Sequence, residues 1–416
     1  MNIYFSGIGG VGIGPLAEIS LDAGYEISGS DVAESLMTSR LQARGVDISF
    51  DQSGSSLRAR HSVNPIDWYV YTSALPVNHP ELVAAQSLGI KTAKRDELLA
   101  HIIAEKNLKL IAIAGTHGKT TTTGMMVWAL RELGLPVSYS IGTTLSWGPS
   151  GKYEPTSEFF VYECDEFDRN FLQFHPHLSI ITNIEHDHTD TYPSKYDYFD
   201  AFSQFAAQSQ AVVTWNSQTT DISLPSNSWL LGDDEVQNFH LAGEHNRLNA
   251  TLVSKGLEYL AVSPDPSYIS DAISRFPGTN RRMEKLAENL YSDYGHTPTE
   301  IRATLQLARE ISDKVVLIYQ PHQNIRQHEI KEQYTDAVFA GATKIYWVPT
   351  YLSREDPGLE TLTPEQLTSA MTESPVTISE LDDKLWSEIV TLVNSGYLVL
   401  GMGAGSIDGW LRKNLA

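Results

Sequence analysis

The chain has 416 residues, 41% of them hydrophobic and 19% charged, which is enough for two or three domains that each bury a core. Its formal net charge is −21, because 30 Lys and Arg stand against 51 Asp and Glu. This balance excludes general attraction to nucleic acids and anionic membranes, although a helix end or a single cation can still bind an anion locally.

Cys164 is the only cysteine, which excludes an internal disulfide and a cysteine-rich zinc site. No apolar run approaches 18 residues, and the first residues lack the pattern of a signal peptide. We therefore expect a cytoplasmic enzyme, a monomer or weak homodimer, without membrane or nucleic-acid partners.

The first hundred residues alternate strands with helices, which predicts an α/β domain with a parallel sheet. The expected strands are residues 3–5, 25–28, 68–71 and 91–93, and the expected helices are about 15–23, 81–88 and 97–103. Gly7–Gly12 forms a dinucleotide-type turn between strand and helix, and Asp31 follows about twenty residues later. Alone, this pattern is weak: it favours a bound nucleotide, with NAD as one alternative.

The pattern restarts after a polar joint at 106–109, with a strand at 108–114 and a helix at 120–133. Between them lies Gly115-Thr-His-Gly-Lys119, a setting typical of a phosphate-binding loop. Lys119 would face the outer phosphates and Thr120 would bind Mg²⁺. Ile113 replaces the first glycine of the usual motif, and a glycine-rich turn with a chance lysine is the alternative.

Further strands are predicted at 159–163, 178–182 and 211–215, a loop at 217–237 and a helix at 246–260. Carboxylates follow the first of these strands, and Glu163 lies nearest to its end, so it is the preferred Mg²⁺ ligand. After the second strand come His186 and His188, and His188 is the preferred ligand for metal or phosphate. A solvated acidic loop and a structural histidine are the alternatives.

A Pro/Gly break at 276–280 precedes a third α/β unit, with strands near 290–292, 315–319, 344–348 and 397–400 and a helix at 299–311. Asn246 and Asn249 share a helix face and could bind adenine or cap the helix. Three further segments are candidate ligand-binding sites. Residues 281–282 follow the Pro/Gly break, and residues 292–300 and 320–326 lie at the ends of predicted strands.

Together and in order, these segments resemble the Mur ligase family, the ATP-dependent amino-acid-adding enzymes of peptidoglycan synthesis. The resemblance implies three α/β domains. These are a Rossmann-like domain for the UDP-sugar (1–106), a central P-loop ATPase-like, mostly parallel sheet domain for ATP (107–278) and a Rossmann-like domain for the amino acid (279–416).

The resemblance also implies residue roles. For the UDP-sugar these are Gly9, Gly10, Val11, Gly12, Asp31 and Ser73. For ATP they are Gly115, Thr116, His117, Gly118, Lys119, Thr120, Thr121, Asn246, Asn249, Arg282 and Asp293. For the amino acid they are His296, His322 and Arg326, and for Mg²⁺ they are Thr120, Glu163 and His188. Catalysis would use Lys119, Glu163, His188 and Arg282, with Arg282 reaching an ATP phosphate from the third domain.

The implied reaction joins an amino acid, expected to be L-alanine, to the lactyl carboxylate of UDP-N-acetylmuramate through an acyl phosphate. Thr297 and Gln323 depart from the family pattern in the amino-acid pocket, and Gln323 replaces an arginine for which Lys331 is a possible substitute. The central domain is also short after Gln204, and no lysine aligns with the carbamylated lysine of some members. The alternatives are a ligase that adds a whole tripeptide, an NAD-dependent oxidoreductase, and a catalytically silent scaffold.

Overall fold

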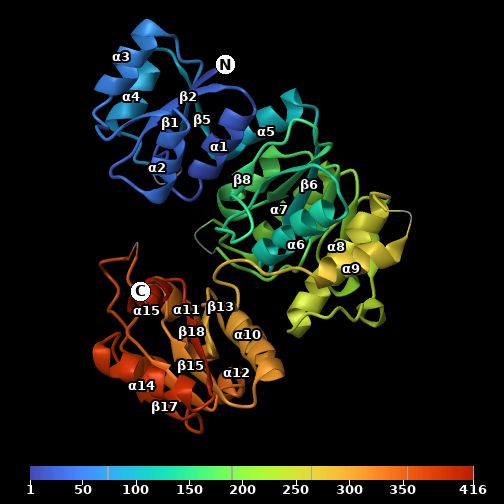
Figure 1. Cartoon of the computed structure of the whole chain (residues 1–416), viewed down its shortest axis with the longest axis vertical. Coiled ribbons are helices and arrows are strands. Elements are labelled where there is room, and N and C mark those ends of the chain that lie inside the picture. The colour runs from blue at the N-terminus through green and yellow to red at the C-terminus, as the bar shows by residue number, and fades with distance from the viewer. Residues whose placement is uncertain (73–74, 189–190, 264, 354, 416) are drawn as a thin grey trace. The chain divides into compact units, whose positions relative to one another are not determined.

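The computed structural model describes residues 1–72, 75–188, 191–263, 265–353 and 355–415, and these form an α/β fold with three mostly parallel sheets (Figure 1). The α/β class predicted from the sequence is therefore confirmed. The chain divides into two compact units, Met1–Val236 with Asn249–Phe276, and Gln237–Leu248 with Pro277–Ala416. The first unit holds two of the sheets, so the domain boundaries expected at 106 and 278 stay predictions.

The first sheet is parallel throughout, in the order β3-β2-β1-β4-β5. Ile3 and Phe5 face one layer of helices, whereas Tyr4 faces Leu57 and Leu82 on the other, as expected for a strand buried on both faces. Strand order reverses on either side of β1, so the turn after β1 lies where such sheets bind ligands. The elements are β1 (Asn2–Ser6), α1 (Gly14–Asp22), β2 (Glu26–Ser30), α2 (Leu36–Ala43), β3 (Asp47–Ser49), α3 (Ser55–Val63), β4 (Trp68–Tyr71), α4 (Pro80–Ser87), β5 (Lys91–Lys94) and α5 (Arg95–Glu105).

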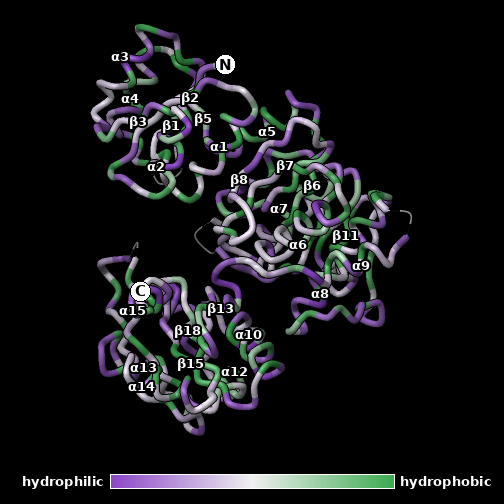
Figure 2. The backbone as a smooth tube through the Cα atoms, in the orientation of Figure 1, coloured by the Kyte–Doolittle hydropathy of each residue, from purple (hydrophilic) through white to green (hydrophobic). Residues whose placement is uncertain are grey.

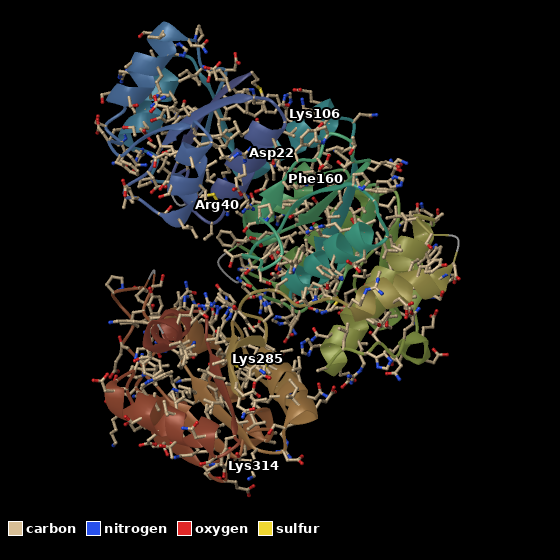
Figure 3. All side chains as sticks on the ribbon, viewed as in Figure 1. Asp22, Arg40, Lys106, Phe160, Lys285 and Lys314 are labelled. Atoms are coloured by element: carbon tan, nitrogen blue, oxygen red, sulfur yellow. The ribbon has the colours of Figure 1, made fainter. Side chains whose placement is uncertain are left out.

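The second sheet has the order β12-β11-β10-β6-β9-β7-β8 and is parallel except for β8. Its central strands are mostly apolar, and Phe160 in β9, labelled in Figure 3, is fully buried. The elements are β6 (Lys109–Ala114), α6 (Lys119–Glu132), β7 (Val137–Ser140), β8 (Gly151–Lys152), β9 (Phe159–Glu163), η1 (Phe167–Gln173), β10 (Leu178–Ile181), α7 (Lys195–Gln208), β11 (Val212–Trp215), η2 (Asn216–Gln218), β12 (Trp229–Leu231), η3 (Asp233–Glu235), α8 (Glu244–Tyr259) and α9 (Pro266–Ser274).

The third sheet has the order β13-β14-β18-β15-β16-β17, with only β13 antiparallel. Leu317 in β15 packs with α10 and α12, while its neighbours Val316 and Ile318 pack with α14 and α15 on the opposite face. Figure 2 shows the hydrophobic colouring of β15 and β18 between these helices. The elements are β13 (Glu284–Ala287), β14 (Leu290–Asp293), α10 (Pro298–Ile311), β15 (Val315–Tyr319), α11 (Asn324–Ile330), η4 (Lys331–Gln333), α12 (Asp336–Phe339), β16 (Lys344–Trp347), α13 (Pro364–Leu367), β17 (Val376–Ile378), α14 (Asp383–Asn394), β18 (Leu398–Met402) and α15 (Ile407–Leu415).

The loop predicted at 217–237 is wrong in part, because it contains the edge strand β12 and two short 3₁₀ helices. The three residues of β12, Trp229–Leu231, are apolar, but the run is shorter than the about four to eight residues that predict a strand, and it lies in a segment rich in Ser, Asp and Asn. No helix within the described residues has both the length and the apolar character needed to cross a bilayer.

The close packing of β2 on β1 gives a stability prediction. A Cβ atom at Gly29 would lie 2.4 Å from the carbonyl oxygen of Phe5 and 2.9 Å from Ile8 Cδ1. We expect Gly29→Ala to lower the free energy of unfolding by about 1–3 kcal/mol, because the backbone must shift to admit the methyl group. Denaturant unfolding measures this.

Gly409→Ala is the control, since Gly409 lies inside α15 and a Cβ atom there meets no atom within 4 Å. It should leave stability unchanged or raise it by up to about 1 kcal/mol. Equal stability of Gly29→Ala and the unmodified protein would contradict the packing argument.

Candidate functional site

The turn between β6 and α6 has a backbone that requires glycine. Gly115 has φ 128° and Gly118 has φ 83°. A Cβ atom at Gly115 would lie 2.2 Å from Thr182 Oγ1, and Gly118, which has no side chain, is the N-cap of α6. The first amides of α6 are therefore free of a capping side chain, which suits them to phosphate oxygens.

The end of β10 holds this turn in place. Thr116 N donates to the carbonyl oxygen of Asn183 at 3.0 Å, and His117 N donates to Asn183 Oδ1 at 2.9 Å. Asn183 Nδ2 and Thr182 Oγ1 both donate to the carbonyl oxygen of His117, at 2.9 and 2.6 Å. Because β10 pairs directly with β6, these bonds fix the shape of the turn without a ligand.

Lys119 forms a buried ion pair with Glu166. Its Nζ lies 2.7 and 3.0 Å from the two carboxylate oxygens and donates to the carbonyl oxygen of Gly115 at 2.6 Å. Burial disfavours the ammonium charge, but Glu166 and Asp165 outweigh it and raise the pKa of Lys119. The lysine is therefore charged and held at the turn 115–118, and its role toward a phosphate stays a prediction.

Thr120 and Glu163 come together, as the proposed Mg²⁺ site requires. Thr120 Oγ1 donates to Glu163 Oε1 at 2.8 Å, and Gly142 N donates to Glu163 Oε2 at 2.8 Å. A Cβ atom at Gly142 would lie 2.9 Å from this carboxylate, so glycine is needed beside it. These neighbouring oxygen donors match the preference of Mg²⁺ for hard ligands.

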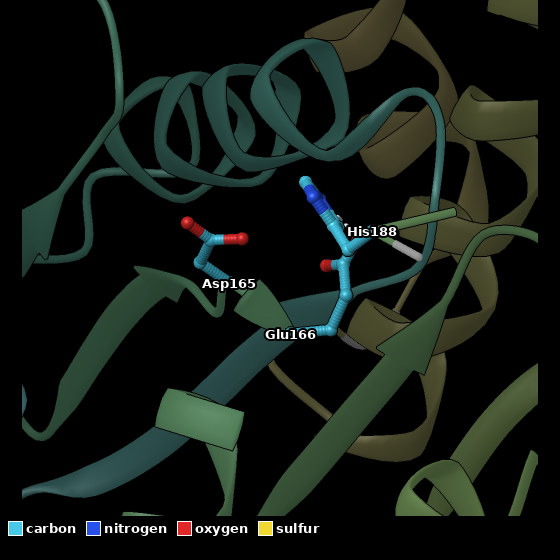
Figure 4. A group of neighbouring side chains, drawn as sticks. All are labelled: Asp165, Glu166 and His188. Carbon is cyan, nitrogen blue, oxygen red and sulfur yellow. Dashed lines mark ion pairs between the residues drawn. The ribbon is translucent and has the colours of Figure 1, made fainter. Parts of the chain in front are cut away.

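His188 lies with Asp165 and Glu166, as Figure 4 shows. One ligand atom from each lies within 4.8 Å of the others, and His188 Nε2 is 3.7 Å from Glu166 Oε1. His188 has φ 55°, a value that residues other than glycine seldom adopt. The structure thus groups the predicted metal residues as Thr120 with Glu163, and His188 with two carboxylates that were not selected from the sequence.

Glu166 is the functional candidate that sequence reasoning missed. Its side chain is 1% exposed, and besides Lys119 it accepts a hydrogen bond from Tyr198 at 3.4 Å. Burial raises the pKa of Glu166, and the charge of Lys119 opposes this. The acidic run 163–168 was the available signal, but proximity to the strand end pointed to Glu163 instead.

The two asparagines of α8 have different contacts. Asn249 is buried, and its amide lies about 3 Å from where a Cβ atom at Gly118 would be, so it faces the phosphate-binding turn. Asn246 Nδ2 donates to the carbonyl oxygen of Ala242 at 2.8 Å. That bond is local to the helix start, but it is not the helix capping given as the alternative to adenine binding, because the amide donates to a carbonyl oxygen instead of accepting from a helix N–H.

At the first glycine turn, Asp31 Oδ2 accepts a hydrogen bond from Gly9 N at 2.7 Å. A Cβ atom at Gly9 would lie 2.7 Å from Ser35 Oγ, whereas Val11 is 90% exposed. The structure therefore joins Asp31 to the turn, and the UDP-sugar-binding roles of these residues stay predictions. Ser73 lies outside the described residues.

In the second unit, the predicted amino-acid-binding residues lie together. Arg326 Nη1 lies 3.0 Å from His296 Nε2, and the rings of His296 and His322 are 5.9 Å apart. Burial lowers the pKa of His296. Burial, His296 and Arg326 lower the pKa of His322 to about 4. At neutral pH the cluster therefore offers neutral imidazoles beside the Arg326 guanidinium, a combination suited to one carboxylate.

Both departures from the family pattern lie at helix starts. Thr297 is the N-cap of α10, where it accepts from Glu300 N at 3.4 Å in a capping box. Gln323 immediately precedes α11 and has φ 61°. Lys331 follows the other end of α11, roughly 12 Å away along a helix at 1.5 Å per residue, which disfavours it as a replacement for the missing arginine.

Asp293 ends β14 and is buried, with its carboxylate accepting from Met283 N and Gly295 N, both at 2.8 Å. Burial raises its pKa, while Arg282 opposes this. Arg282 itself lies 3.7 Å from Glu300 and 5.2 Å from the ring centroid of Tyr294. The ATP-binding roles expected for Asp293 and Arg282 stay predictions.

The lowered pKa of His322 gives a pH prediction. The unfolded chain takes up this proton below about pH 6.5, whereas the folded protein does so only near pH 4. Between about pH 6.5 and 4 the unfolded state therefore binds more protons at His322 than the folded state does. The free energy of unfolding falls as the pH is lowered through this interval. An NMR titration should find its midpoint near 4.

His322→Asn serves to assign the resonance and should reduce the loss of stability over the same pH interval. A midpoint near pH 6.5 for His322 would show that its ring is not buried among these groups.

Three family models match successive parts of the chain: the Mur ligase family catalytic domain at 2–107, the Mur ligase middle domain at 113–228, and the Mur ligase glutamate ligase domain at 281–405. The chain is 31% identical to a UDP-N-acetylmuramate–L-alanine ligase of Carboxydothermus hydrogenoformans, over 98% of this chain and 94% of the relative.

Two solved structures have a similar fold. The UDP-N-acetylmuramate-alanine ligase MurC of Thermotoga maritima has a TM-score of 0.77 at 24% identity, covering 100% of this chain and 98% of the other. A murein peptide ligase of Psychrobacter arcticus has a TM-score of 0.66 at 21% identity, with the same coverage. Three successive family matches, together with a relative above 30% identity along almost the whole chain, establish that this protein belongs to the Mur ligase family.

Proposed function

We propose that this protein is an ATP-dependent ligase that joins L-alanine to the lactyl carboxylate of UDP-N-acetylmuramate in peptidoglycan synthesis, forming ADP and phosphate. The observation that carries the proposal is the preformed turn 115–118. Lys119 donates to the carbonyl oxygen of Gly115 in this turn and pairs with Glu166, and Thr120, the next residue, donates to Glu163. Relatives named for this reaction match nearly the full chain. ATP and the UDP-sugar are cytoplasmic nucleotides, so we propose the cytoplasm as its location.

The reaction has two steps. A lactyl carboxylate oxygen attacks the γ-phosphorus of ATP, the bond to the bridging oxygen breaks, and ADP leaves with that electron pair. The amine of the amino acid then attacks the carbonyl carbon of the acyl phosphate, loses a proton, and expels inorganic phosphate. The first step brings one anion against another, so the site must supply positive charge.

Lys119 supplies that charge at the turn. The ion pair with Glu166 keeps its ammonium group charged and oriented although it is largely buried. The backbone amides at the start of α6 have no capping side chain and can donate to phosphate oxygens without reorganisation, because Asn183 already fixes the turn. Thr120 and Glu163 fit Mg²⁺, which when bound would neutralise phosphate charge.

In the second unit, Arg326 with the neutral His296 and His322 would bind the carboxylate of the incoming amino acid. Gln323 in place of an arginine leaves one fewer cation here, which keeps a tripeptide acceptor as the second candidate. The NAD-dependent alternative rested on the glycine turn 7–12, and the Mur ligase match at 2–107 accounts for that turn.

The acceptor can be identified by phosphate release. With ATP, Mg²⁺ and UDP-N-acetylmuramate, L-alanine should give the highest kcat/KM in a panel of amino acids and the tripeptide L-alanyl-γ-D-glutamyl-meso-diaminopimelate. A preference for the tripeptide would overturn the L-alanine assignment, and no acceptor-dependent release with any panel member would overturn the ligase proposal.

Removing the phosphate lysine tests the site. Lys119→Ala should lower kcat/KM by at least about 10²–10³-fold, because it removes a cation from the transferring phosphate and weakens ATP binding. Steady-state phosphate release and calorimetric ATP binding measure the two effects.

Lys109→Ala is the matched control, since Lys109 begins the same strand and forms an exposed pair with Glu158. Its activity should equal that of the unmodified protein. Retention of ATP affinity and rate in Lys119→Ala would contradict the assigned role.

A further inference from the structure

A second cation in the first unit is held by a chain of polar groups. Arg95 begins α5, and its Nε and Nη2 atoms lie 3.1–3.3 Å from the carboxylate of Asp96. Tyr162 Oη donates to the same carboxylate from β9. Asp96 and Tyr162 are 3% and 4% exposed, so the guanidinium has a fixed, buried support.

The remaining guanidinium nitrogen of Arg95 is directed at the first glycine turn. Its Nη1 atom lies 3.3 Å from where a Cβ atom at Gly12 would be. In the part of the chain that the structure describes, no hydrogen-bond acceptor is recorded for Nη1, and the side chain is 30% exposed. Arg95 therefore has a donor available to a ligand on this turn.

The glycine turn offers few free amide donors for an anion. Gly9 N donates to Asp31 and Gly10 N donates to the carbonyl oxygen of Gly7, at 2.7 and 3.0 Å. Two of its amides are thus used internally, and the Asp31 carboxylate adds a negative charge. An anion bound here needs a cation from another element, and Arg95 presents one at Gly12.

We propose that Arg95 binds the diphosphate of the sugar nucleotide on this turn, and that Asp96 and Tyr162 are positioning residues that fix its guanidinium. This inference rests on the proposed function for the identity of the ligand. Tyr162 directly precedes Glu163, so the same strand that supports Arg95 also carries a candidate Mg²⁺ ligand of the ATP site.

Calorimetric binding to the full chain tests this with three ligands: UDP, UDP-N-acetylglucosamine and UDP-N-acetylmuramate. The first two carry the diphosphate but no lactyl group. Arg95→Gln should weaken all three by a similar factor of about 10–100, the range for a hydrogen bond to a charged group. Arg95→Lys should recover part of the affinity, because it restores the charge without the planar fork.

Arg44→Gln is the control, since it also removes one positive charge from this unit but pairs with Asp22 at the far end of α1. It should bind all three ligands normally. Both variants should retain ATP affinity, which separates loss of the proposed contact from misfolding.

Unchanged affinity of Arg95→Gln for all three ligands would overturn the inference. A loss confined to UDP-N-acetylmuramate would overturn the diphosphate assignment and place Arg95 on the lactyl carboxylate. If the unmodified protein bound none of the three, the proposed function itself would fail.

The positioning role has its own readout. Asp96→Asn should raise the KM for UDP-N-acetylmuramate several-fold while leaving the KM for ATP and the kcat unchanged. A merely structural role for Asp96 would lower kcat and ATP affinity together, and no change in any parameter would remove Asp96 from the proposal.

Discussion

The position of β6 between β10 and β9 is the constraint on which the candidate ATP site depends. Parallel strands end at the same edge of a sheet, so the turn after β6 meets Asn183 from one neighbour and Glu163 from the other. Asn183 shapes the turn, and Glu163 reaches Thr120 one residue beyond Lys119. Residues as far apart in sequence as Gly115 and Asn183 become neighbours because their strands are adjacent in the sheet.

The sequence predicts the elements of this site well because they are buried on both faces. The strands at 159–163 and 315–319 are predicted to the residue, since their apolar runs are continuous and bounded by polar residues. Strand β12 is not predicted because its apolar run has only three residues and lies within a polar segment, which is too short a signal to predict a strand. Helices α9 and α14 were not predicted, although the structure shows that each buries one apolar face.

Local motifs also predict which residues stand at the turn, but not what they contact. Lys119, Thr120 and Glu163 follow from strand ends and glycines, whereas the importance of Glu166 depends on its burial against Lys119. Asn246 and Asn249 are three residues apart, so the sequence predicts the same role for both. In the structure Asn249 is buried and faces the turn, whereas Asn246 bonds locally. Such differences depend on contacts between residues far apart in the sequence, and a single sequence does not show those contacts.

Three of the cations at these sites lie beside a carboxylate. Lys119 pairs with Glu166 and Arg95 with Asp96, and Arg282 lies near Glu300. Each cation is thereby oriented before a ligand arrives, so less entropy is lost on binding. The same carboxylates oppose any anion that approaches, and a singly charged ion gains little against them. In the proposed ATP site a polyphosphate would also contact backbone amides and carry Mg²⁺, and these contacts would offset the repulsion in a protein with a net charge of −21.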